Sequence, residues 1–209
     1  MKKIFAQGAE AILYKQRLDS EEVLVKDRIK KRYRIAQIDK ALRRQRTRYE
    51  ARLLDRAARE GVPVPRVLER DEQHSKLVFE FIPGLKLRDW LEQEKDENEI
   101  KAVIKGVGRD TAKLHCADII HGDLTTSNLI KLGNKVYFID FGLGCFSKKI
   151  EDKAVDLHLF KECLRSRHYS IWSSCWGAFL SGYKSLHEAE EVLERVKIVE
   201  SRGRYKKKN

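Results

Sequence analysis

Apolar and polar positions divide the chain into a strand-rich first part and a helical second part. From Tyr33 to Glu60 the apolar residues recur at helical spacing, and Gly61 and Pro63 end this stretch. Short strands are predicted where apolar residues alternate with polar ones or form brief runs, at 3–5, 11–16, 22–26, 67–69 and 77–81. The first part of the chain should therefore be a sheet with one helix.

After the Pro83-Gly84 turn, the pattern becomes mainly helical. A helix is predicted over 100–114, with His115 expected to cap its end, and a hairpin at Gly133-Asn134 should join two strands. From Asp152 onward the pattern is helical, with breaks expected at Gly177, Gly182 and Ser185. This order predicts an α+β fold of two lobes: a sheet lobe at 1–82, a helical lobe at 83–201 and a basic tail at 202–209.

Composition narrows the class of protein. The chain has 209 residues, of which 42% are hydrophobic and 36% charged, as expected for a globular protein. Its apolar runs are far shorter than the roughly 18 residues that cross a bilayer. Its four cysteines form no CxxC pair, which favours a reducing compartment over a disulfide framework. We therefore expect a cytoplasmic protein.

The net charge of +12 is concentrated in two blocks. Residues 26–59 hold 14 basic and four acidic residues, a net +10, and residues 202–209 add +5. Two basic blocks favour a polyanionic partner, although a solvated helix face and a disordered tail would give the same pattern. The tail residues that are candidates for contacting such a partner are Arg202, Arg204, Lys206, Lys207 and Lys208.

Three short motifs carry the predicted chemistry. His121-Gly122-Asp123 is followed by Asn128 and then by Asp140-Phe141-Gly142. Asp123 could accept a proton from an attacking hydroxyl or orient a water, and the oxygens of Asn128 and Asp140 suit Mg²⁺. Each motif alone is typical of a turn or a helix cap. In this order, behind a strand-rich lobe, they are close to the kinase set that binds Mg²⁺ and ATP.

The first lobe can supply the other parts of an ATP site. Lys26 ends a predicted strand where a kinase has its phosphate-binding lysine, and Glu50 is its best-placed helix partner, although it could instead pair with a neighbouring arginine. The remaining nucleotide-binding candidates are Gly8 and Ala9, in the turn between the first two strands, and Glu80 and Ile82, where a hinge would face adenine.

These residues resemble the small atypical protein kinase of the KEOPS (EKC) tRNA-modification complex, also called the p53-related kinase family. The matching strings extend over nearly the whole chain, and the most specific are HGDLTTSNLI at 121–130 and EDKAVDL at 151–157. The resemblance implies a kinase fold with an antiparallel sheet lobe and a reduced helical lobe. Only 67 residues follow Gly142, and the loop at 7–11 has no Ser for the family's phosphorylation mechanism.

The resemblance also implies a function. The chain would be a Ser/Thr kinase or ATPase that uses ATP and Mg²⁺ to support threonylcarbamoyladenosine modification of tRNA. Asp123 would be the catalytic residue, Lys26 and Glu50 the phosphate-positioning pair, and Asp156 a brace for the catalytic loop. The implied partners are the threonylcarbamoyl-transferase subunit, a small subunit bound to the first lobe, and tRNA. A small-molecule phosphotransferase and a non-catalytic tRNA-binding scaffold remain alternatives.

Overall fold

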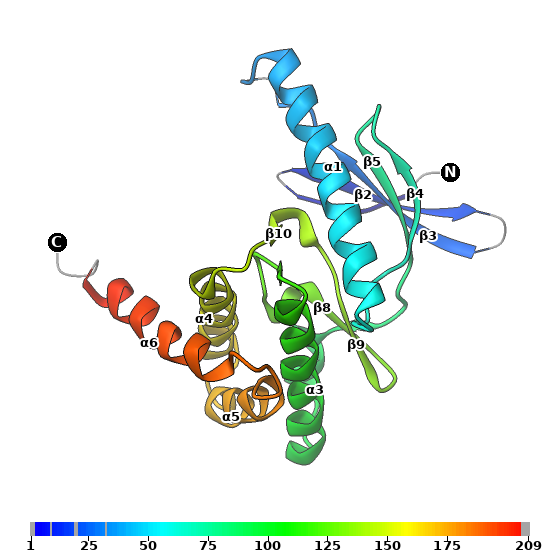
Figure 1. The fold of residues 1–209 in the computed structure, drawn as a ribbon. Helices are drawn as coiled ribbons and strands as arrows, with labels where there is room; N and C mark the ends of the chain where they lie inside the picture. The colour runs from blue at the N-terminus through cyan, green and yellow to red at the C-terminus, as the bar shows by residue number, and fades with distance from the viewer. Residues whose placement is uncertain (1–2, 9, 19–20, 32, 206–209) are drawn as a thin grey trace.

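The first lobe of this computed structural model is an antiparallel sheet with one long helix (Figure 1). The structure describes residues 3–8, 10–18, 21–31 and 33–205. Within them, the sheet has the order β1-β2-β3-β5-β4. Its members are β1 (Lys3–Gln7), β2 (Ala11–Leu18), β3 (Glu21–Arg28), β4 (Val67–Asp71) and β5 (Lys76–Glu80). The strands predicted from the apolar pattern are all present, each a few residues longer than the pattern or shifted by one.

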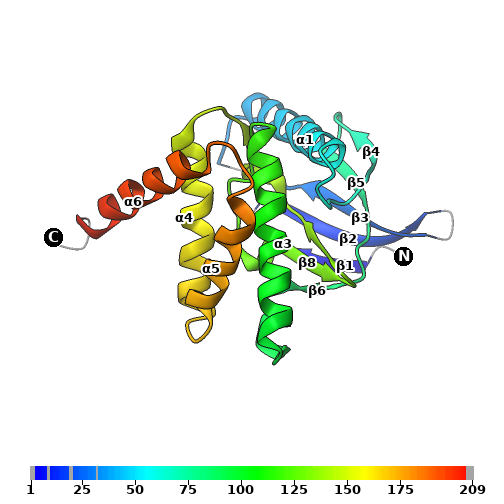
Figure 2. The same cartoon turned by 60° about the horizontal axis from the view of Figure 1, so that its bottom comes forward.

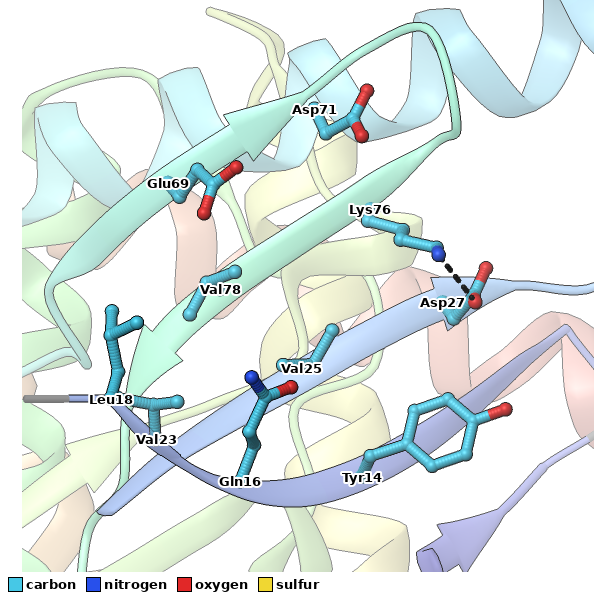
Figure 3. A pocket seen from close by; sticks show the side chains of 10 residues that line it. All are labelled: Tyr14, Gln16, Leu18, Val23, Val25, Asp27, Glu69, Asp71, Lys76 and Val78. Carbon is cyan, nitrogen blue, oxygen red and sulfur yellow. Dashed lines mark ion pairs between the residues drawn. The ribbon is translucent and has the colours of Figure 1, made fainter. Parts of the chain in front are cut away.

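The helix α1 (Ala36–Arg59) buries its apolar stripe against one face of this sheet. Because side chains alternate along a strand, Lys26 and Arg28 of β3 share the face that meets α1, and Asp27 points to the other face. Figure 3 shows that other face, where a shallow cavity of about 160 Å³ is lined by valines and an ion pair joins Asp27 to Lys76 at 3.4 Å. The two charged side chains of β3 that matter for the site therefore point inward.

The second lobe consists mainly of helices (Figure 2) and also contains two small sheets. Its helices are α2 (Leu87–Gln93), α3 (Glu97–Cys116), α4 (Ile150–Arg167), α5 (Trp172–Tyr183) and α6 (Ala189–Tyr205). The strands β6 (Leu85–Lys86), β8 (Leu129–Leu132) and β9 (Lys135–Phe138) form one sheet, and β7 (Ile119–Ile120) pairs with β10 (Cys145–Phe146). Two 3₁₀ turns, η1 (Thr126–Asn128) and η2 (Phe141–Leu143), carry motif residues between these strands.

Two breaks expected from glycines in the last third of the chain were wrong. Gly177 and Gly182 both lie inside α5. The helical breaks fall at 168–171 and at 184–188, and the second of these confirms the break expected at Ser185. Gly182 serves helix packing, because a Cβ there would lie 2.0 Å from the carbonyl oxygen of Lys105 in α3. The absence of a side chain therefore lets α5 approach α3 closely, which a local turn rule cannot foresee.

One buried cluster links the two lobes. It includes Leu54 of α1, Phe79 of β5, Phe141 of η2 and Phe160 of α4. No helix in the described part of the chain is long and apolar enough to cross a membrane. The lobes therefore share a continuous core, and the motif residues lie where they meet.

Candidate active site

Lys26 lies at the centre of the charged groups between the two lobes. Its Nζ donates to Glu50 Oε1 at 2.6 Å and to Asp140 Oδ1 at 2.7 Å. β3 supplies the lysine, α1 the glutamate and the start of η2 the aspartate, so three segments distant in sequence meet at one amine. The structure thus brings together the pair expected from the first lobe and the aspartate expected from the second.

The charges in this group keep Lys26 and Asp140 ionised. Burial lowers the pKa of Lys26, but the charges of Glu50 and Asp140 outweigh it and raise that pKa above its ordinary value. For Asp140, burial raises the pKa, and the charge and hydrogen bond of Lys26 more than reverse this effect and hold the pKa below its usual range. The amine is therefore protonated and the carboxylate ionised at neutral pH.

Arg28 is a member of this group that the sequence patterns did not single out. Its Nη2 donates to Glu50 Oε2 at 2.5 Å, so the two carboxylate oxygens of Glu50 each hold a different cation. The side chains of Arg28 and Glu50 are only 4% and 2% exposed. The sequence did contain a signal for Arg28, because a residue two positions after Lys26 in the same strand points to the same side of the sheet.

The loop at 121–123 takes its shape from Gly122. This residue has a φ of +80°, and a Cβ on it would lie 2.3 Å from the carbonyl oxygen of Leu143. A side chain at this position would therefore meet both a strained backbone and a clash. The kinase arginine that Gly122 replaces cannot be accommodated in this loop, which gives the departure from the usual motif a physical reason.

His121 joins this loop to the segment around Asp140. Its Nε2 lies 3.1 Å from the carbonyl oxygen of Ile139, and its Nδ1 accepts from the backbone N–H of Asp123 at 3.3 Å. Burial lowers the pKa of His121 below its ordinary value. A neutral ring with its proton on Nε2 satisfies both contacts, and the ring packs against Phe141 with centroids 4.6 Å apart.

Asp156 of α4 holds the same loop from the helical lobe, as the family resemblance implied. Its Oδ2 accepts from the backbone N–H of His121 at 2.6 Å, and its Oδ1 accepts from that of Gly122 at 2.8 Å. The expected capping role of His115 was wrong. His115 is fully buried, with Nδ1 2.7 Å from the hydroxyl of Tyr183 and Nε2 3.5 Å from Asp156 Oδ2.

Asn128 is hydrogen-bonded to Asp123, five residues earlier in the same segment. Its Nδ2 donates to the Asp123 backbone carbonyl at 2.9 Å and to Asp123 Oδ2 at 2.8 Å. The amide nitrogen is thereby committed, which leaves the amide oxygen of Asn128 as its acceptor. The backbone N–H of Ile139 donates to the Asn128 carbonyl at 3.0 Å, so the segments that carry Asn128 and Asp140 are held side by side.

Two adjoining cavities meet at Lys26 and Asp140. The first, of about 240 Å³, is mostly apolar and is lined by Glu80 and Ile82 of the segment between the lobes as well as by Asn128. The second, of about 270 Å³, is lined by Gly8 and Gly142 and by the charged side chains of Glu10, Lys26, Arg28, Asp123 and Asp140. An elongated ligand with an apolar ring at one end and anionic groups at the other would fit this pair of cavities.

Comparisons with known proteins agree with this geometry. A family model described as the RIO domain matches residues 10–145. The KEOPS complex subunit Bud32 of Pyrococcus abyssi is 44% identical over 216 residues, covering 99% of this chain and 98% of that protein. The chain belongs to the Bud32 family of RIO-domain proteins. The resemblance stated from the sequence motifs is thereby confirmed.

Further relatives carry related names. A probable serine/threonine-protein kinase BUD32 homolog of Archaeoglobus fulgidus is 43% identical, covering 88% of this chain and 89% of that protein. A probable bifunctional tRNA threonylcarbamoyladenosine biosynthesis protein of Methanothermobacter thermautotrophicus is 41% identical over 97% of this chain. The chain spans 36% of that bifunctional protein.

Solved structures show the fold. A structure of WaaP in complex with acyl carrier protein has a TM-score of 0.68 at 16% identity and covers 96% of this chain and 88% of its own. A structure of the Rio2 kinase-ADP/Mg²⁺-phosphoaspartate complex of Chaetomium thermophilum has a TM-score of 0.64 at 13% identity and covers 98% and 71%. The predicted bilobal kinase-like α+β fold is confirmed.

The expected basic tail is only partly within the described residues. α6 continues to Tyr205, so Arg202 and Arg204 belong to this helix, and Arg202 pairs with Glu151 in the first turn of α4. Ala9 of the predicted phosphate loop lies outside the described residues, and so do three tail residues, Lys206, Lys207 and Lys208.

Proposed function

We propose that this chain is a Mg²⁺- and ATP-dependent Ser/Thr kinase or ATPase that works as a subunit of the KEOPS complex. In that complex it would support threonylcarbamoyladenosine modification of tRNA. The observation that carries the proposal is Lys26, held at once by Glu50 and Asp140 at the junction of an apolar and a charged cavity. The relatives' names, which include a KEOPS subunit and a tRNA threonylcarbamoyladenosine biosynthesis protein, supply the biological setting.

ATP suits the two cavities in one orientation. Adenine would occupy the apolar cavity beside Glu80 and Ile82, where a backbone edge can pair with the base. The backbone carbonyl of Ile82 already accepts from Gly84 at 2.9 Å, so its N–H is the group that we assign to the base. The phosphates would then pass Lys26 and enter the charged cavity beneath Gly8.

Magnesium suits the oxygens of Asn128 and Asp140. Mg²⁺ usually takes one or two protein ligands together with substrate phosphates. Among the described residues, no group of three or more His, Cys, Asp or Glu could hold a metal by itself, so phosphate oxygens would complete the coordination. The two hydrogen bonds of the Asp140 carboxylate both fall on Oδ1, from Lys26 and from the Gly142 N–H, and Oδ2 is the ligand that we assign to the ion. When bound, the ion would neutralise charge that develops on the phosphates.

The residues of the chain can carry the transfer step. Lys26 would orient the α- and β-phosphates, with Glu50 holding its amine in place. Asp123 would accept a hydrogen bond from the attacking water or hydroxyl and then take its proton. The hydrogen bond from Asn128 would keep the Asp123 carboxylate pointing into the cleft. Asp156 and His121 would fix the loop so that this geometry exists before the nucleotide binds.

The proposed partners are the threonylcarbamoyl-transferase subunit, a small subunit on the first lobe, and tRNA. The basic segment 202–209, with a net charge of +5, is our candidate for a tRNA contact. Phosphate contacts make such binding salt-dependent. Deletion of 202–209 should therefore lower tRNA affinity and flatten its dependence on salt. If the deletion leaves tRNA affinity unchanged across a salt series, the tail does not contribute to tRNA binding.

The experiment for the proposal is ATP turnover by the purified chain, alone and with the transferase subunit and tRNA. We expect turnover that rises with the partner or with tRNA and is abolished by Asp140→Ala, with the fold retained. Wild-type turnover in that variant would contradict the proposal. Stimulation by an aminoglycoside-like or choline-like molecule, without the partner, would favour the small-molecule phosphotransferase instead.

A further inference from the structure

Arg28 has a position in the cleft that pairing with Glu50 does not explain. It lines the charged cavity together with Asp123 and Gly142, whereas it is absent from the lining of the apolar cavity. Lys26, in contrast, lines both cavities. If the nucleotide lies along the cleft with adenine in the apolar cavity, Arg28, which lines the far cavity and not the apolar one, lies nearest to the terminal phosphate.

The charges around Arg28 also point toward an anion. In the structure, the two cations Lys26 and Arg28 are balanced by the two carboxylates Glu50 and Asp140. Once Asp140 ligates a cation of its own, Glu50 would be left as the carboxylate hydrogen-bonded to both Lys26 and Arg28, because Glu10 lies 3.9 Å from Arg28 and pairs with Arg46. A buried excess of positive charge is costly unless an anion compensates it, and a phosphate group placed in this cavity would do so.

The reach of the guanidinium is consistent with this assignment. Arg28 Nη2 is the atom bound to Glu50, and it would lie 3.6 Å from a Cβ placed on Gly142, so this edge borders the segment that follows Asp140. Arg28 Nη1 lies 3.9 Å from Glu10 Oε2, beyond hydrogen-bond length. An arginine fork can hold a carboxylate with one edge and still offer donors to phosphate oxygens with the rest.

We propose that Arg28 is a second phosphate-binding residue, which contacts the terminal phosphate of ATP while Lys26 holds the inner phosphates. This inference rests on the proposed function, because it presupposes that the cleft binds Mg-ATP. It adds a residue that the kinase motifs do not contain. Arg28 would make the site discriminate between a nucleoside triphosphate and a diphosphate.

The test measures how the wild type and variants of Arg28 bind two nucleotides. Dissociation constants are measured, in the presence of Mg²⁺, for ADP and for the non-hydrolysable β,γ-imido analogue of ATP. Arg28→Met should weaken the triphosphate analogue by roughly tenfold to a hundredfold, as expected for lost hydrogen bonds to a charged group. ADP affinity should change by less than about threefold, because in our assignment the inner phosphates stay with Lys26.

Two further variants keep the result decisive. Arg48→Met removes a positive charge from an exposed position on α1, where Arg48 pairs with Glu72, and should leave both affinities unchanged. Arg28→Lys keeps the charge but loses the fork, and should weaken the triphosphate analogue selectively and less than Arg28→Met does. If Arg28→Met fails to fold, Arg28→Lys tests the proposal by itself.

Each outcome separates this inference from the proposed function. Equal weakening of ADP and of the triphosphate analogue would overturn the inference, because Arg28 would then act only through Glu50 and Lys26. Unchanged affinity for both ligands in the Arg28 variants would overturn it as well. A wild-type chain that binds neither nucleotide would overturn the proposed function together with the inference, whereas the first two results leave the proposed function intact.

Discussion

Asp156→Asn is the substitution that probes the support of the catalytic loop most sharply. Asp156 is buried, and its two carboxylate oxygens accept two backbone N–H groups of the loop, from His121 and Gly122. Asparagine has only one oxygen. In either orientation, its NH₂ group would face a backbone N–H, and one buried donor of the loop would lose its acceptor.

The magnitude follows from these two bonds. A buried donor without a partner costs about 1–3 kcal/mol, and hydrogen bonds to an ionised acceptor are roughly twice as strong as neutral ones. We therefore expect Asp156→Asn to lower the free energy of unfolding by about 2–4 kcal/mol. In a chain of this size, such a loss corresponds to a fall in Tm of about 5–15 °C.

The assay is urea unfolding of the wild type and the variant, combined with amide hydrogen exchange at 121 and 122. The exchange of these two amides should accelerate more than that of the α4 backbone. The matched control is Glu162→Gln, the same carboxylate-to-amide change on the exposed face of α4, where Glu162 pairs with Arg165. An exposed pair of this kind is worth less than about 1 kcal/mol. If Asp156→Asn costs no more than the control, the bracing role is refuted.

Three other predictions concern the glycines and the pH dependence. Gly122→Ala should destabilise the chain by about 1–3 kcal/mol, since φ is +80° and a Cβ meets the carbonyl of Leu143; unaltered thermal unfolding would contradict this. Gly182→Ala should lower the free energy of unfolding by about 1–3 kcal/mol, because the added Cβ clashes with α3. Gly177→Ala, whose Cβ would have open space around it, should raise that free energy by about 0.5–1 kcal/mol. Similar changes of Tm in both variants would contradict this prediction. Finally, burial depresses the pKa of His121, so the unfolded chain binds more protons below about pH 6.5, and the free energy of unfolding should fall as the pH drops from 7 toward 5. NMR titration should find His121 unprotonated at pH 6.5, and a protonated ring there would contradict the assignment.

Much of the fold was accessible from apolar periodicity. The sheet of the first lobe, α1 and α3 follow from strand and helix periods that agree with their local stop signals. The pairing of Lys26 with Glu50 was also predictable, because the strand and helix positions of a kinase motif set constrain which carboxylate can reach the lysine. These features depend on short segments whose local preferences agree with the tertiary structure.

The rest depended on tertiary contacts that leave little trace in the local sequence. Gly182 was expected to break a helix, and only the neighbouring α3 makes it a packing residue. His115 sits at the end of α3, and its role comes from Tyr183, 68 residues further along the chain. Arg28 resembled one more charge of a basic run. Its importance arises because α1 buries one face of β3 and leaves Glu50 to be shared by two cations.

Our main proposal is that the residues around Lys26 catalyse phosphoryl transfer from Mg-ATP. Asp123→Asn tests it most directly, because the variant keeps the size of the side chain and its contact with Asn128 but loses the base. Nucleotide affinity and ADP release are measured on the same preparation of the full chain, with Mg²⁺ and with whichever partner gives the highest wild-type rate. We expect nucleotide affinity within about threefold of the wild type and a loss of turnover of at least about a hundredfold. Turnover by Asp123→Asn at the wild-type rate would contradict the proposal.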